Sequence, residues 1–198
     1  TNSSSTLLNS FSEIYNSNQK IIINQAKKEA LQNKNLINDF NKFLRLKILV
    51  IGETIIDHYY FGDAIGKSGK DPIIAIQEEK DEKYIGGAAT IASHISGFSK
   101  NVTLLSVIGE KNTHKYFLEK NLPKHIKKIW IVKKGAPTII KKRFVDNISN
   151  NKLLSTYIMD DRSLSINEEK QVINILSKKI KYFDLVIVSD YGHGFLSK

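Results

Sequence analysis

The sequence contains no cysteine, which excludes disulfide bonds and thiolate metal sites. It has no apolar run near the ~20 residues that a membrane-spanning helix needs, and its start lacks a basic-then-apolar signal pattern. With 41% hydrophobic and 25% charged residues among 198, we expect a globular, cytoplasmic protein with one domain and an appendage. No set of residues predicts a metal site, since His193 stands alone.

Acidic residues are outnumbered by basic ones, and the formal net charge is +10. The stretch from Asn121 to Arg143 holds eight Lys or Arg and no acid. Such a stretch is compatible with nucleic-acid binding, with anionic small-molecule binding or with a solvated basic face. The other lysines are scattered among Asn and Ile, so we favour solvated lysines for most positions and a small anion over nucleic acid as the ligand.

Glycine and proline are absent from the first 46 residues, where apolar residues recur at helical spacing. We expect helix there, after a polar, serine-rich start. From Lys47 onward strands and helices alternate, with strands predicted near residues 48–51, 102–107, 128–132 and 185–189. The mostly apolar strands predict an α/β sheet that is covered on both faces.

Two further segments have a clear local pattern. Residues 59–62 and 72–77 are β-prone and flank a polar loop, so we expect paired strands that form a flap over the sheet edge. Ser165 and Glu168 form a capping-box signature, and the helix after it should bury one stripe. The predicted stripe consists of Val172, Ile173, Leu176 and Ile180.

Three glycine- and aspartate-bearing motifs follow predicted strands, where α/β sheets bind small molecules. In the first, a turn is expected after Gly52, and Asp57 could accept hydrogen bonds from two polyol hydroxyls or else cap an element or pair with a lysine. In the second, Gly86 and Gly87 open a helix, either to let a ligand approach the backbone or to pack closely on the sheet.

The third motif places Asp190 in a turn after a buried-type strand, where an unused polar group is costly. A predicted strand in residues 137–146 adds two cations, because Lys141 and Arg143 alternate with Lys142 and so share one face. These two side chains could hold a phosphate or carboxylate of a substrate, or they could face solvent.

Together the motifs KILVIGETIID, YIGGAATIA, PTIIKKRFV and VIVSDYGHG, in this order and spacing, resemble the amino-terminal half of ribokinase-like (PfkB) carbohydrate kinases. The similarity spans residues 47–198 and is greatest to the branch that phosphorylates D-glycero-D-manno-heptose 7-phosphate for lipopolysaccharide. It implies a doubly wound α/β sheet with a small β lid at about residues 59–83, often used for dimerisation. The implied substrate-binding residues are Asp57, Gly86, Gly87, Thr90, Lys141, Arg143 and Asp190.

The resemblance also implies the chemistry, which is transfer of the ATP γ-phosphoryl group to a sugar hydroxyl with the help of Mg²⁺. The family's catalytic Gly-x-Gly-Asp motif and most of its ATP site belong to a carboxyl-terminal half that this chain lacks. We therefore expect an inactive fragment with no catalytic residue of its own. Thr90 stands where the family commonly has asparagine, and His193 stands where heptose kinases have lysine. The resemblance therefore does not specify which sugar is the substrate.

Residues 1–12 resemble the serine/threonine-rich end of cytidylyltransferase-type nucleotidyltransferase domains. The expected organisation is thus the end of such a domain at 1–12, a helical linker at 13–46 and the first part of a sugar kinase at 47–198, within a bifunctional parent. The expected partners are a sugar phosphate and a second copy bound through the lid, without membrane or nucleic acid. The alternative hypothesis is a basic nucleic-acid-binding or dimerisation module with no catalysis.

Overall fold

The computed structural model describes residues 17–32, 34–67, 69 and 73–196. The chain forms two compact units, Thr1–Phe43 and Leu44–Lys198. The described part of the first unit consists of helices α2 (Ser17–Gln32) and α3 (Lys34–Phe43). The segment 1–12, for which a nucleotidyltransferase end is predicted, lies outside the described residues. Among the described helices, none combines the length and apolar character needed to span a membrane.

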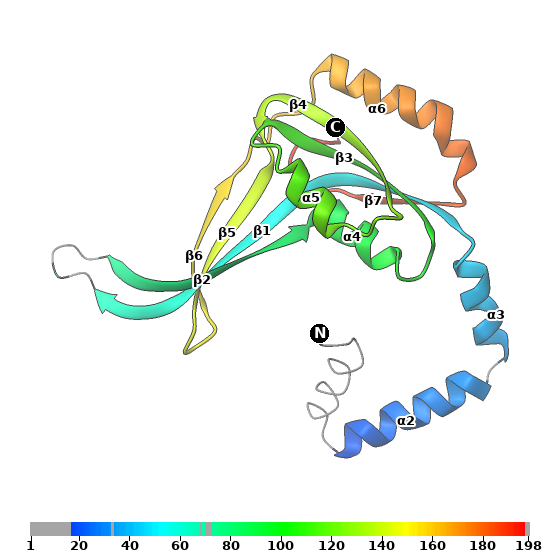
Figure 1. Ribbon diagram of the computed structural model, residues 1–198. Coiled ribbons are helices and arrows are strands. Elements are labelled where there is room, and N and C mark those ends of the chain that lie inside the picture. The colour runs from blue at the N-terminus through cyan, green and yellow to red at the C-terminus, as the bar shows by residue number, and fades with distance from the viewer. Residues whose placement is uncertain (1–16, 33, 68, 70–72, 197–198) are drawn as a thin grey trace. The chain divides into compact units, whose positions relative to one another are not determined.

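The second unit is an α/β structure (Figure 1). Its strands are β1 (Lys47–Lys67), β2 (Ile74–Gly86), β3 (Asn101–Lys111), β4 (Lys127–Pro137), β5 (Ile139–Asp146), β6 (Lys152–Ile158) and β7 (Leu185–Ser189). Its helices are α4 (Gly87–Ile95), α5 (Lys115–Asn121), α6 (Ile166–Lys179) and the 3₁₀ turn η1 (Ile180–Tyr182). All four strands predicted from the apolar runs are present.

Strand β1 belongs to two sheets in succession. Its residues 47–53 pair in parallel with β3, and its residues 48–52 pair in parallel with β7. Its residues 55–67 pair in antiparallel with β2, and its residues 55–62 pair in parallel with β5. Strand β6 pairs with β5 and completes this second sheet, here called the lid sheet. The prediction of a turn after Gly52 is wrong, because neighbours on both sides keep the backbone extended. The predicted flap is present as the antiparallel pair of β1 and β2, but both strands are longer than predicted, so residues 59–62 lie opposite residues 78–82 and not 72–77.

The core lies on both faces of the parallel sheet. Ile48 and Val50 pack with Ala88 and Ala92 of α4 on one face. The alternate residues of β1, Leu49 and Ile51, belong to a second cluster that includes Val172 of α6 on the other face. Figure 1 shows α4 and α6 on opposite sides of these strands. The prediction of a sheet covered on both faces is therefore confirmed, because successive side chains of a strand point to opposite faces.

The predicted capping box of α6 is present. The Ser165 hydroxyl accepts the Glu168 N–H at 3.4 Å, and the Glu168 carboxylate accepts the Ser165 N–H at 2.7 Å. Glu168 also accepts the N–H of Lys134 on β4 at 2.7 Å, which fastens the helix start to the sheet. The predicted apolar stripe is only partly right, since Ile173 and Ile180 are 63% and 45% exposed. Ile175 and Leu176 pack on the core beside Val172, because only one side of α6 faces the sheet.

We expect Glu168→Gln to lower the free energy of unfolding by about 1 kcal/mol at neutral pH, since a side-chain cap and one bond to β4 are weakened. Burial alone would raise the pKa of Glu168, but the N–H groups of Lys134 and Ser165 outweigh it and lower the pKa below 4.5. This carboxylate therefore contributes stability above pH 4.5, and the contribution is lost as the pH falls through the lowered pKa. Urea unfolding of both proteins at several pH values measures the difference, which should shrink in acid; a difference that does not change with pH would contradict this role.

Candidate functional site

Asp57 lies on β1 just after this strand leaves the parallel sheet and enters the lid sheet. Its position is opposite Tyr84 of β2 on one side and Lys141 of β5 on the other. The side chain is 25% exposed, so a ligand can reach it. The change of sheet along one strand thus holds a carboxylate between two neighbours at the carboxyl-terminal side of the core strands.

Arg143 makes an ion pair with Asp57, in which its guanidinium Nη1 donates to the Asp57 carboxylate Oδ1. Burial alone would lower the pKa of Arg143, but the hydrogen bond and charge of Asp57 outweigh it and raise this pKa. The guanidinium also lies over the Tyr59 ring, 5.3 Å from its centre. Because a guanidinium has five N–H donors, Arg143 keeps donors for an anion beside the pair.

Gly86 brings bare backbone against the same carboxylate. A Cβ built on Gly86 would overlap Oδ2 of Asp57, so only glycine leaves the acid in this place. Gly87 begins α4 with a φ of 61° in the left-handed region, and a Cβ there would overlap the carbonyl of Glu53. Asp57, Gly86 and Arg143 therefore meet at the start of α4, whose first N–H groups favour negative charge.

Two further predicted residues, Thr90 and Lys141, belong to the elements that carry Asp57, Gly86 and Arg143 or adjoin them. The Thr90 hydroxyl donates to the Ile85 carbonyl, so its proton joins the first turn of α4 to the end of β2. The Lys141 ammonium lies 5.9 Å from the centre of the Tyr157 ring and 6.0 Å from that of Tyr191. Lys141 thus connects the lid sheet with the turn that follows β7.

Asp190 is placed differently from Asp57. It is exposed, and its carboxylate accepts the N–H of Gly192 at 2.9 Å within its own turn. The structure therefore groups Asp57, Gly86 and Arg143, with Gly87 and Lys141 nearby, and it gives Asp190 a bond that shapes the third turn. Among the described residues, no group of three or more His, Asp or Glu could hold a metal ion.

Sequence reasoning missed Glu53, which is 0% exposed on β1. Its carboxylate accepts the N–H groups of Tyr191 and His193, each at 3.0 Å, and that of Phe195 at 3.4 Å. The one feature of the sequence that could have identified Glu53 is its position as an acid directly after Gly52 in an otherwise apolar run. Glu53 ties the turn after β7 to the strand that carries Asp57, so it positions one side of the site against the other.

The chain is similar in sequence to several curated proteins. The chain is 33% identical over 155 residues to the bifunctional protein HldE of Aliarcobacter butzleri, covering 76% of this chain and 31% of that protein. It is 28% identical over 155 residues to the HldE protein of Nitratiruptor sp., covering 78% and 33%. The chain thus spans about a third of the length of these curated relatives. No model of a protein family matches the chain.

The fold is also that of a solved structure, described as a possible 1-phosphofructokinase from Thermotoga maritima. The two superpose with a TM-score of 0.51 at 10% sequence identity, over 71% of this chain and 44% of the other. At this identity the likeness is one of fold. The chain is thus a homologue of the HldE proteins, and its second unit forms part of a ribokinase-like fold.

Proposed function

We propose that this chain binds the sugar in an ATP-dependent carbohydrate kinase, one that phosphorylates a heptose 7-phosphate or a similar sugar phosphate for lipopolysaccharide precursors. The observation that carries this proposal is the Asp57–Arg143 pair held against the bare backbone of Gly86. A carboxylate can accept hydrogen bonds from two neighbouring hydroxyls of a sugar, and such charge-assisted bonds are strong and directional.

Charge supports a phosphorylated substrate. Arg143 keeps donors that Asp57 does not use, and Lys141 is on the same face of β5. Two cations beside a hydroxyl-binding acid suit a sugar that carries its own phosphate. The lid sheet would cover such a substrate and exclude water, which favours phosphoryl transfer over hydrolysis.

ATP and Mg²⁺ enter the proposal through the family. In this proposal the nucleotide and its Mg²⁺ are bound by other parts of a longer protein, as the resemblance to the family implies. What the described residues do is to orient the sugar and to neutralise its phosphate. A bifunctional parent with a nucleotidyltransferase domain is part of the same proposal, as is self-association through the lid sheet, where Ile65, Ile74 and Leu154 are exposed.

The test uses the longer protein and this chain in parallel. We expect the longer protein to form ADP when D-glycero-D-manno-heptose 7-phosphate, ATP and Mg²⁺ are present, with the phosphorylated hydroxyl located by ³¹P NMR. This chain alone should bind the sugar phosphate in a calorimetric titration without forming ADP. Hexose 6-phosphates serve as matched competitors. If neither protein responds to any sugar phosphate, the carbohydrate proposal is overturned.

A further inference from the structure

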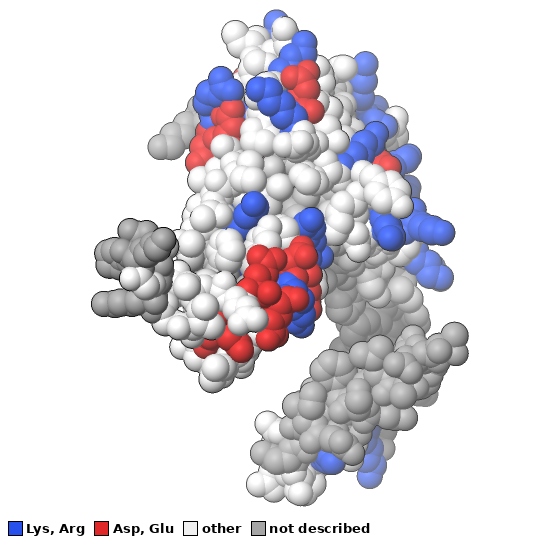
Figure 2. All heavy atoms as spheres, turned by 60° about the vertical axis from the view of Figure 1, so that its left-hand side comes forward, with Lys and Arg blue, Asp and Glu red and all other residues white. Residues whose placement is uncertain are grey.

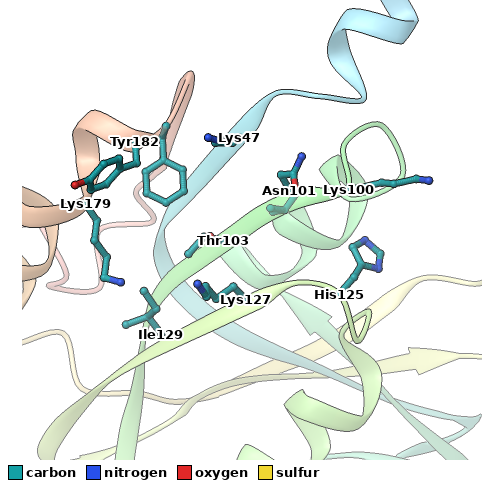
Figure 3. A pocket seen from close by; sticks show the side chains of 11 residues that line it. Lys47, Lys100, Asn101, Thr103, His125, Lys127, Ile129, Lys179 and Tyr182 are labelled. Atoms are coloured by element: carbon teal, nitrogen blue, oxygen red, sulfur yellow. The ribbon is translucent and has the colours of Figure 1, made fainter.

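A second hollow lies at the other end of the parallel strands, where β1, β3 and β4 begin. It has a volume of about 370 Å³, within the range of small-molecule sites. Its walls come from the first residues of these three strands and from the end of α6 with the turn after it (Figure 3). Because Asp57 follows the opposite end of the core part of β1, this cavity is separate from the proposed sugar site.

The cavity is strongly basic. Four lysines line it, namely Lys47, Lys100, Lys127 and Lys179, with His125 beside them and no acid among the lining residues. Within the described part of the chain, none of the four makes an ion pair. The nearby Asp184 carboxylate accepts the backbone N–H of Lys47 at 2.7 Å. Four clustered ammonium groups repel one another, and a concave wall concentrates their field on whatever enters.

Two of the four lysine side chains extend toward each other. Figure 3 shows the ends of the Lys127 and Lys179 side chains turned toward each other beside Ile129. Four of the acidic side chains lie away from this cavity, because Glu78, Glu79, Asp81 and Glu82 are on β2 in the lid sheet. Figure 2, in which the lid comes forward, shows such a group of acidic side chains. An anion from solution would offset the repulsion between these two exposed ammonium groups.

We propose that this cavity binds a small molecule with a diphosphate group, whose organic part lies against the apolar wall. That wall consists of Ile129, Phe183 and Tyr182, while the hydroxyl of Thr103 and the amide of Asn101 add hydrogen-bonding groups. A diphosphate carries enough negative charge to pair with several ammonium groups at once. The volume of about 370 Å³ is large enough for one such molecule.

The test compares two double variants with the same net charge. Lys127→Gln with Lys179→Gln removes the facing pair, and Lys128→Gln with Lys178→Gln removes the sequence neighbours, which do not line the cavity. We expect the first to weaken the binding of inorganic pyrophosphate, measured by calorimetry at low salt, at least about tenfold and the second less than about twofold. Without ligand, the first variant should unfold at the same temperature as the parent or higher, because repulsion is relieved.

Three results would overturn the proposal. They are no binding of pyrophosphate by the parent chain, equal weakening in both double variants, and loss of pyrophosphate binding in a double variant Lys141→Gln with Arg143→Gln, which would place the ion at the sugar site. A second titration, with ADP in place of pyrophosphate, tests whether the apolar wall binds the organic part of the ligand. Binding at least about tenfold tighter than that of pyrophosphate supports an organic part on the wall, and equal affinity contradicts it. Because Asp57 is outside the cavity, this proposal can fail or hold independently of the proposed sugar kinase function.

Discussion

Asp57→Asn is expected to weaken sugar-phosphate binding by about 3 kcal/mol, roughly a hundredfold in the dissociation constant. The physical reason is the loss of the charge that accepts the sugar hydroxyls and pairs with Arg143. Calorimetric titration with D-glycero-D-manno-heptose 7-phosphate measures it. The matched control is Asp63→Asn, the same change on β1 but in the lid, opposite Gln77. Equal affinities of Asp57→Asn and the parent chain would remove Asp57 from the site.

Gly86→Ala tests the same site without any change of charge. The backbone of Gly86 has a φ of −131° and a ψ of −179°, which alanine adopts easily. The new methyl group would nevertheless overlap the Asp57 carboxylate and displace it from its position beside Arg143. We expect a similar loss of affinity, with a change in unfolding free energy much smaller than the loss of binding. Normal affinity in this variant would show that the position of the carboxylate is not critical.

Glu53→Ala is expected to lower the free energy of unfolding by about 3 kcal/mol, because three backbone N–H groups lose their buried acceptor and a cavity is left. These donors belong to Tyr191, His193 and Phe195, so the turn after β7 should loosen first. Urea unfolding measures the loss, and hydrogen exchange of the three amides locates it.

Two further variants make this prediction specific. Glu53→Gln keeps one acceptor oxygen and the volume, so it should lose less stability than the alanine variant. Glu119→Gln alters an exposed carboxylate on α5, whose side chain is 47% exposed, and should change stability by less than about 0.5 kcal/mol. If Glu53→Ala were as stable as the Glu119 variant, the buried carboxylate would not hold the turn.

Local patterns predicted much of the second unit. Short apolar runs predicted β1, β3, β4 and β7, and the Ser165–Glu168 spacing predicted the start of α6, because each of these signals lies within a few consecutive residues. The alternation of side chains along a strand predicted that Lys141 and Arg143 share a face. The prediction at Gly52 failed because a glycine permits a turn but does not require one, and pairing with distant strands kept β1 extended.

The amino-acid sequence was enough to predict the fold class, the four core strands, the start of α6 and the motifs that resemble those of carbohydrate kinases. The folded structure was needed to show that Arg143 is the partner of Asp57, that Glu53 holds the turn after β7, and that lysines from separate elements line one cavity. The reason is that helix caps and strand alternation depend on residues a few positions apart. Partners of charged groups depend on strand register across the whole sheet, and no local pattern specifies which distant side chains that register brings together.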